Sequence, residues 1–147
     1  RSLIPYLDSS ALVKLLIQEP GSDEVWAAVG SVAPVTSRIT YAEARAALAR
    51  RERESTLLHE GDWTMARDNL VAHWRRLRVI EVTQPVVELA GDLADTFGLR
   101  GYDAVQLASA QQVAVAGGED LCFVSFDRRL NRAAQVLGMN LVAQAPR

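Results

Sequence analysis

Apolar positions along the chain fall into two kinds of segment that alternate. Short runs rich in Val, Ile and Leu, typical of buried strands, are separated by longer segments whose apolar residues recur at helical spacing. This alternation predicts the α/β fold class, with a parallel sheet of about five strands covered by helices. The predicted strands cover residues 3–7, 33–36, 78–82, 121–125 and 140–143. Pro5 cannot donate to a sheet ladder, so we expect it at the strand's beginning or with its nitrogen facing no neighbour.

Apolar stripes and capping residues locate the helices. One stripe, which we interpret as facing the core, consists of Trp63, Ala66, Leu70, Trp74 and Leu77. A second consists of Val86, Leu89, Leu93 and Phe97. Further helices are predicted over residues 10–17, 22–28, 41–53, 102–116 and 128–137. Glycines placed to end helices in the left-handed conformation are Gly98, Gly117, Gly118 and Gly138.

The composition is that of an ordinary globular protein, with 49% hydrophobic and 23% charged residues among 147. We see no internal repeat, low-complexity tract or linker, so residues 1–147 are predicted to form a single domain. The apolar runs are shorter than the about 20 residues that a membrane-spanning helix needs, and no signal-peptide pattern is visible. We therefore expect a cytoplasmic protein without a membrane partner.

Four acidic residues stand at related places in this pattern. Asp8 and Asp127 each follow a predicted strand and precede a helix. Asp103 falls in the first turn of its helix, and Glu43 in the first turn of the helix after the second strand. Ligands of open parallel sheets bind beyond the carboxyl ends of the strands, near the point where strand order reverses. We therefore expect the four carboxylates at one edge of one sheet.

Each acid also has a local structural explanation. Aspartate is a favoured N-cap, which would account for Asp8 and Asp127 without any chemistry. Thr40 and Glu43 have the spacing of a capping box, and Asp103 suits the positive end of its helix dipole. The joint position of the four favours a functional site, because clustered carboxylates raise one another's proton affinity unless a cation is bound.

The donor set indicates a hard cation. Carboxylate oxygens with no nearby cysteine or histidine suit Mg²⁺ or Mn²⁺ rather than zinc. His59 and His73 lack ligand spacing to a second histidine, and there is no glycine-rich phosphate loop. The net charge of −2 argues against nonspecific nucleic-acid binding through a uniformly basic surface, while a local basic rim stays open.

Four segments of the sequence resemble the PIN-domain nucleases, and within them the VapC toxins of bacterial type II toxin–antitoxin pairs. These segments are LDSSALVKL, SRITYAEARAAL, GLRGYDAVQLASA and FVSFDRRLNRAA, in this order along nearly the whole chain. The resemblance implies a three-layer α/β/α fold whose acidic pocket holds Mg²⁺ or Mn²⁺ and cleaves RNA. It also implies a small cognate antitoxin that covers the pocket, and a homodimer.

The resemblance assigns roles to individual residues. The metal-binding aspartates would be Asp8 and Asp103, with Glu43 and Asp127 acting through water or a second ion. Supporting residues would be Ser9, Ser125 and Asn131. Two of these have alternatives, since Ser9 could simply cap the first helix and Asn131 could either touch Asp127 or the substrate or lie exposed.

A bound cation would let a phosphodiester approach the carboxylates and would make hydroxide available near neutral pH. Hydrolysis by water would leave a 5′-phosphate and a 3′-hydroxyl. RNA would be held by basic residues around the pocket, for which the candidates are Lys14, Arg38, Arg50, Arg128, Arg129 and Arg132.

Other functions stay open at this point. A receiver-like signalling domain also binds Mg²⁺ at the end of a parallel sheet, but it needs a lysine near the last strands, and the only lysine is Lys14. A haloacid-dehalogenase phosphatase would require a second aspartate where this chain has Ser10. A catalytically inactive PIN-like scaffold would bind partners without cleaving RNA.

Overall fold

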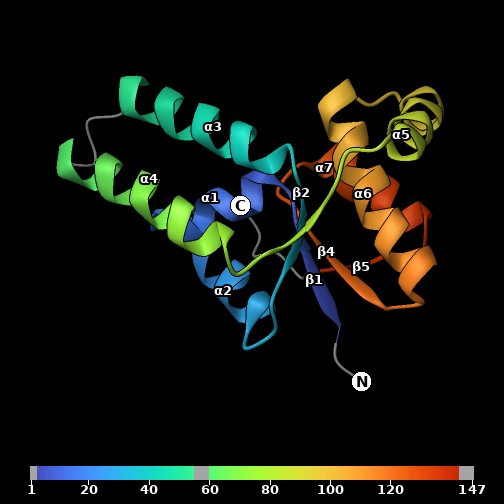
Figure 1. Ribbon diagram of the computed structural model, residues 1–147, viewed down its shortest axis with the longest axis horizontal. Helices are drawn as coiled ribbons and strands as arrows, with labels where there is room; N and C mark the ends of the chain where they lie inside the picture. The colour runs from blue at the N-terminus through green and yellow to red at the C-terminus, as the bar shows by residue number, and fades with distance from the viewer. Residues whose placement is uncertain (1–2, 55–59, 143–147) are drawn as a thin grey trace.

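The computed structural model describes residues 3–54 and 60–142 of the chain. Its centre is a five-stranded sheet in the order β3-β2-β1-β4-β5, in which all neighbouring strands are parallel (Figure 1). The strands are β1 (Ile4–Leu7), β2 (Val35–Ser37), β3 (Arg78–Ile80), β4 (Leu121–Val124) and β5 (Asn140–Leu141). The predicted α/β class with about five parallel strands is confirmed.

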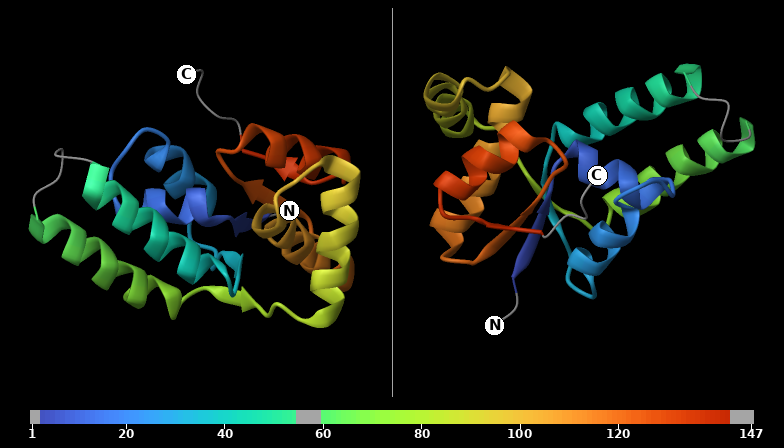
Figure 2. Two further views of the ribbon diagram at one scale, coloured as in Figure 1. Left: turned by 90° about the horizontal axis from the view of Figure 1, so that it is seen from above. Right: turned by 180° about the vertical axis from the view of Figure 1, so that it is seen from behind.

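Helices cover both faces of the sheet and complete three layers (Figures 1 and 2). One face carries α1 (Ser9–Leu16), α2 (Ser22–Val29), α3 (Thr40–Glu54) and α4 (Glu60–Trp74). The opposite face carries α5 (Gln84–Phe97), α6 (Gly101–Gly117) and α7 (Arg128–Val136). The pair α3 and α4 runs side by side and extends beyond the sheet (Figure 1).

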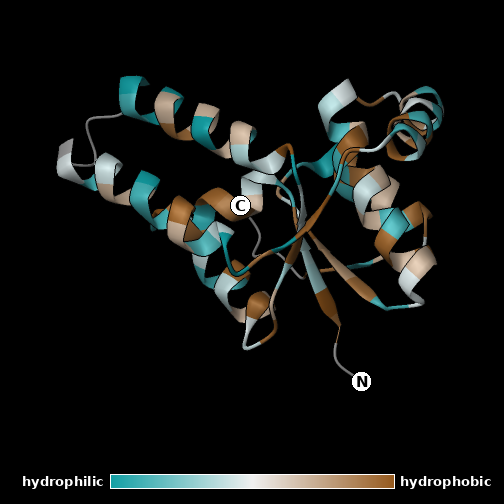
Figure 3. Ribbon diagram, in the orientation of Figure 1, coloured by the Kyte–Doolittle hydropathy of each residue, from teal (hydrophilic) through white to brown (hydrophobic). Residues whose placement is uncertain are grey.

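Two hydrophobic clusters fill the spaces between the layers. Alternate side chains of the strands enter opposite clusters, so that Tyr6 and Phe123 stack toward α5 and α6 while Leu7 and Val124 pack toward α1 and α3. Both predicted stripes face these clusters, through buried residues such as Leu70 of α4. In Figure 3 teal and brown residues alternate along α3, as expected of a helix with one buried face.

Each strand is shorter than predicted at one end, although β2 continues one residue beyond its predicted end, to Ser37. The residues assigned to strands that lie outside them are Leu3, Ala33, Pro34, Glu81, Val82, Ser125 and Val142. Ala143 falls outside the described residues. The strands end early because the chain turns into loops and helix caps at the sheet edge, where pairing stops.

Pro5 lies within the central strand. The N–H groups of Ile4 and Asp8 donate to carbonyls on the β4 side. Since successive N–H groups of a strand point to opposite sides, the nitrogen of Pro5 points toward the β2 side, where β2 begins only at Val35, opposite Tyr6. The nitrogen thus lies beside the segment that precedes β2, as its missing N–H requires.

Helix ends follow the expected capping chemistry with small shifts. The first helix begins at Ser9, one residue earlier than predicted, because Asp8 is its N-cap. Gly98 and Gly118 adopt positive φ angles of 66° and 59° at the C-caps of α5 and α6, as predicted. Leu77 lies beyond the end of α4 and packs against the core from the following turn. None of the helices described is both long and apolar enough to cross a membrane.

Candidate active site at the sheet edge

The strand order reverses between β1 and β4. Chain order runs outward from β1 through β2 to β3, whereas β4 lies on the other side of β1. Asp8 directly follows β1, and Asp127 follows β4 by three residues at the start of α7. Both predicted acids therefore stand at the carboxyl edge, at the crevice where parallel sheets bind ligands.

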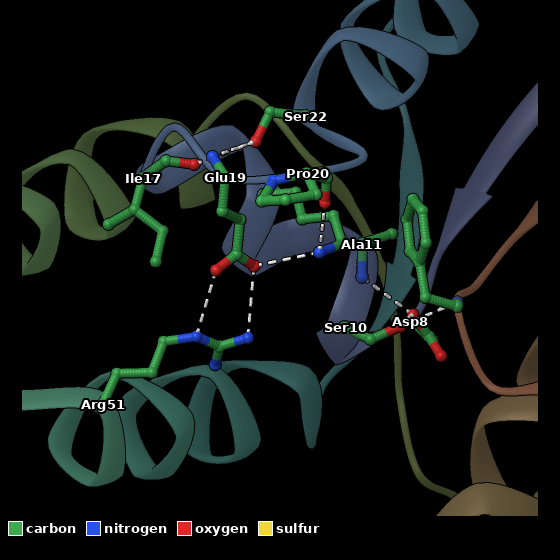
Figure 4. A network of polar contacts seen from close by, with 10 residues as sticks. Asp8, Ser10, Ala11, Ile17, Glu19, Pro20, Ser22 and Arg51 are labelled. Atoms are coloured by element: carbon green, nitrogen blue, oxygen red, sulfur yellow. Dashed lines mark hydrogen bonds and ion pairs between the residues drawn. The ribbon is translucent and has the colours of Figure 1, made fainter. Parts of the chain in front are cut away.

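The carboxylate of Asp8 is buried, with 4% of the residue exposed, and is fixed by three donors. Its Oδ1 accepts from the hydroxyl of Ser10 at 2.7 Å and from the N–H of Ala11 at 3.0 Å, as Figure 4 shows. Its Oδ2 accepts from the hydroxyl of Ser125 at 2.5 Å. The helix-capping explanation is therefore correct, and the same carboxylate is held rigidly at the sheet edge.

Two serines connect Asp8 to the turn that carries Asp127. Ser10 accepts from the N–H of Phe126 at 3.1 Å, and Ser125 accepts from the N–H of Asp127 at 3.1 Å. Each hydroxyl thus donates to Asp8 and accepts from the turn after β4. This arrangement fixes the spacing between the ends of β1 and β4.

Burial raises the pKa of Asp8 from the ordinary 3.8 to about 6. Hydrogen bonds from Ser125, Ser10 and Ala11 act in the opposite direction, because they favour the ionised form. The negative charge of Asp103 raises the pKa of Asp8 further. A cation bound beside this carboxylate would offset part of the cost of keeping it ionised in a buried position.

Glu43 is oriented by Gln106, which sequence reasoning missed. The Gln106 amide donates to Glu43 Oε1 at 2.7 Å and to Thr40 Oγ1 at 2.9 Å, and its Oε1 accepts from the hydroxyl of Tyr6 at 2.7 Å. The capping box is not formed, because Thr40 is buried in this network and also bonds Thr36 at 2.8 Å. Glu43 is thus held by α6 rather than by its own helix.

The remaining acids complete a coupled group. Burial raises the pKa of Glu43, and the charges of Asp8 and Asp103 raise it further. Burial also raises the pKa of Asp103, and the charge of Asp127 adds to this while Arg100 opposes it. Asp127 is exposed and caps α7 by accepting from the N–H of Leu130 at 3.0 Å. The four predicted acids therefore act on one another electrostatically, as expected of a shared site.

Within residues 3–54 and 60–142, no three His, Cys, Asp or Glu side chains are arranged as a group that could hold a metal ion. Mg²⁺ commonly takes one or two carboxylates and several waters, a form that does not need such a group. Asp8 agrees with that form, since Oδ1 already accepts two hydrogen bonds and Oδ2 accepts one among the described residues. The all-oxygen donor set fits a hard divalent cation.

A sequence profile of the PIN domain matches residues 6–136. The chain belongs to the PIN-domain family. The chain is similar to Ribonuclease VapC49 of Mycobacterium tuberculosis strain H37Rv, with 40% identity over 136 residues and 90% of each chain covered.

Two solved structures superpose on this chain over most of its length. PAE2754 from Pyrobaculum aerophilum superposes with a TM-score of 0.64 at 26% identity, over 96% of this chain and 90% of that one. A toxin–antitoxin complex from Klebsiella pneumoniae contains a chain that superposes with a TM-score of 0.60 at 17% identity, over 84% of this chain and 86% of that one. The predicted three-layer PIN fold is confirmed.

The supporting residues of this PIN domain differ partly from expectation. Ser125 binds Asp8, but the helix cap proposed for Ser9 belongs to Asp8, and the nearby hydroxyl that binds Asp8 is that of Ser10. Asn131 is neither exposed nor bonded to an acid, because its amide donates to the carbonyl of Ser125 at 2.8 Å. Asn131 therefore supports the residue that holds Asp8.

Lys14 does not lie on a solvent-facing rim. It is buried, with 9% exposed, and its ammonium donates to Glu19 at 3.0 Å and to the carbonyl of Pro20 at 2.8 Å. The ammonium also lies 4.6 Å from the centre of the Phe126 ring. Arg51 reaches the same Glu19 carboxylate from α3, as Figure 4 shows. We therefore assign Lys14 to the packing of the loop after α1 instead of to RNA.

Gly21 closes this loop onto the site. Its φ of 97° favours glycine, and a Cβ there would lie 2.6 Å from Cε1 of Phe126. Phe126 stands between Ser125, which binds Asp8, and Asp127. The loop after α1 thus presses against the turn that carries two site residues.

Two adjoining hollows lie beside the acids. One, of about 650 Å³, is bordered by α1 and α3, and the other, of about 760 Å³, by α3, α5 and α6. Both hollows are lined by Glu43, Arg50 and Tyr102, and Asp103 lines the second. They therefore form one continuous depression along the acidic site.

Of the predicted RNA contacts, Arg50 is the one that lines these hollows. Arg38 is exposed and pairs with Glu81 at the end of β3. The other candidates, all exposed on α7, are Arg128, Arg129 and Arg132. Arg129 bonds the carbonyl of Gly98 at 3.3 Å.

Proposed function

We propose that this chain is a divalent-metal-dependent endoribonuclease, the toxin of a toxin–antitoxin pair. The observation that carries the proposal is the coupled acid group, in which buried Asp8 keeps a pKa of about 6 beside Asp103 and Glu43. Such a group costs folding stability, and ionisable groups whose pKa values are shifted in this way cluster at functional sites. The 40% identity to a relative named Ribonuclease VapC49 supports RNA as the substrate.

The four acids and two serines of the site would have different roles in metal binding and catalysis. Asp8 and Asp103 would hold Mg²⁺ or Mn²⁺, with Asp127 acting through water. When bound, the cation supplies Lewis-acid stabilisation of the phosphoryl oxygen and lowers the pKa of water at the site. Ser10 and Ser125 keep Asp8 in place, as their hydrogen bonds show.

Glu43 is suited to handle the nucleophile. Burial raises its pKa toward neutral pH, which suits a general base, and Gln106 fixes its orientation. In the proposed step, the oxygen of water forms a bond to phosphorus while the bond to the 3′ oxygen breaks. Glu43 takes the proton of the water, and the leaving 3′ oxygen is protonated by solvent. The products are a 5′-phosphate and a 3′-hydroxyl.

The test is to incubate the purified chain with total cellular RNA and Mg²⁺ and to map the new 5′ ends. EDTA should abolish cleavage, and Asp103→Asn should reduce its rate by at least about 100-fold. Asp92→Asn is the matched control, since Asp92 is exposed on α5 outside both hollows.

Cleavage that persists in EDTA, or an Asp103→Asn variant as active as the wild type, would reject the proposal. Products that end in a 2′,3′-cyclic phosphate would reject hydrolysis by water, because they require the 2′-hydroxyl of RNA as nucleophile. Mn²⁺ or Mg²⁺ binding without any cleavage would favour the inactive scaffold instead.

The proposal includes an antitoxin as partner and a homodimer as the assembled form. Support for the antitoxin comes from the shared fold with a chain of the toxin–antitoxin complex from Klebsiella pneumoniae. An antitoxin that binds over the hollows should abolish RNA cleavage when mixed with the chain. Sedimentation equilibrium of the chain alone tests the dimer.

A further inference from the structure

Tyr102 is a large ring that the fold leaves in solvent. It stands in the first turn of α6, directly before Asp103, and 69% of it is exposed. An aromatic ring gains more from burial than most side chains do, so folding stability does not account for this position. Its location beside an acid of the proposed active site calls for a functional explanation.

The ring stands where the two hollows meet. Tyr102 lines both of them, together with Glu43 and Arg50. The walls on either side are small and apolar, formed by Ala42 and Ala46 on α3 and by Ala90 and Gly91 on α5. A Cβ added at Gly91 would meet no atom within 4 Å, which shows that the α5 wall is open. A flat group could therefore lie against Tyr102.

Two arginines flank the same ring. Arg50 lines both hollows and Arg100 lines the second. Within the described part of the chain, neither guanidinium forms an ion pair or a hydrogen bond, whereas Arg51 is engaged by Glu19. Arg50 is thus available to an anion such as a phosphate, whereas the charge of Arg100 already acts on Asp103.

We propose that Tyr102 is a stacking platform for one nucleobase of single-stranded RNA, with Arg50 binding a neighbouring phosphate. The inference rests on the proposed ribonuclease function and adds the residue that positions the substrate. An aromatic face beside a cationic track is the arrangement with which proteins hold single strands. A duplex fits poorly, because its bases are stacked on one another and cannot reach the ring.

The first experiment measures kcat and KM on a short single-stranded RNA that contains a mapped cleavage site. Tyr102→Leu should raise KM by about 5- to 100-fold and leave kcat within about twofold, because base–aromatic stacking contributes to binding. Tyr102→Phe keeps the ring and should behave as the wild type. Val115→Ala is the matched control, since Val115 is on the same helix and 71% exposed, but stands near its other end.

The second experiment removes single bases from the RNA. In the wild type, one abasic position near the cleavage site should raise KM as much as Tyr102→Leu does. In the Tyr102→Leu variant the same abasic position should cause no further rise, because the two changes remove one contact. Independent, multiplicative effects at every position would overturn the proposal.

The phosphate contact has its own measurement. Arg50→Gln should reduce the slope of log KM against log salt concentration by about 0.7, the value for one contact to a single strand. Arg53→Gln is the control, since Arg53 is exposed on the same helix and lines neither hollow. An equal slope in Arg50→Gln and the wild type would remove Arg50 from the proposal.

These outcomes are separate from a failure of the proposed function. If the wild type cleaves RNA but Tyr102→Leu has an unchanged KM, the stacking platform is wrong and the ribonuclease stands. The exposed ring would then belong to a protein interface. A matching loss in Tyr102→Phe would also overturn the platform, because it would assign the effect to the hydroxyl. If the wild type cleaves no RNA, the ribonuclease itself is wrong.

Discussion

Replacing Asp8 with asparagine should raise the free energy of unfolding near neutral pH and flatten its dependence on pH. In the folded protein, burial holds the pKa of Asp8 at about 6, whereas the ordinary value is 3.8. One pKa unit corresponds to about 1.4 kcal/mol, so the difference of about 2 units corresponds to about 3 kcal/mol. This is the cost of keeping Asp8 ionised in the folded protein.

The sign follows from proton binding. Between about pH 4 and pH 6 the folded protein binds more protons at Asp8 than the unfolded chain does, so stability falls as pH rises through this range. Above about pH 6 the full cost is present. The amide of the Asp8→Asn variant has no such titration, although it cannot accept from Ser125 as the carboxylate does, and we subtract about 1 kcal/mol for that lost bond. The expected net gain near neutral pH is about 2 kcal/mol.

The assay is urea unfolding in EDTA at several pH values from about 4 to 8. Asp92→Asn, at an exposed position on α5, should retain the pH dependence of the wild type. Added Mg²⁺ should stabilise the wild type more than Asp8→Asn, because the proposed site uses the carboxylate of Asp8 to hold the cation, and binding to the folded state raises the free energy of unfolding. Equal pH dependence in Asp8→Asn and the wild type would refute the burial of an ionised carboxylate at this position.

Two further substitutions test the contacts around the site. Gln106→Leu should lower the free energy of unfolding by about 2–4 kcal/mol, because it leaves the buried hydroxyls of Tyr6 and Thr40 without their amide partner. Adding Tyr6→Phe should recover part of that loss in urea unfolding, and a purely additive loss would contradict the network. Lys14→Met should cost about 1–3 kcal/mol because it removes the hydrogen bonds of the ammonium to Glu19 and to the carbonyl of Pro20, with no change in the salt dependence of RNA cleavage. A smaller salt slope would restore Lys14 as an RNA contact.

The sequence was sufficient to place Asp8 and Asp127. Each follows a strand and precedes a helix, and this local order together with the rule for parallel sheets determines the edge at which they lie. The capping roles came from the same local information, since an N-cap depends only on the next three residues.

Contacts between distant segments could not be predicted in the same way. Gln106 is one amide among several on a long helix, and its partners Tyr6 and Thr40 lie 100 and 66 residues away. The stripe pattern of a helix shows which face is buried, but it does not show which polar group on that face finds a partner. Lys14 was misplaced for the same reason, because its ammonium is satisfied by the turn that follows its helix.

The double duty of Asp8 and Asp127 determines how inactive forms of this protein should be made. Each carboxylate begins a helix by accepting a backbone N–H, from Ala11 and from Leu130. Alanine at either position would remove the cap along with the charge, and the loss of the cap by itself costs about 1 kcal/mol of stability. Lost activity in an alanine variant would then mix chemistry with a frayed helix. Asparagine keeps an oxygen that can accept the capping hydrogen bond. An asparagine variant should therefore be inactive yet correctly folded, and suited to trapping a bound substrate or partner.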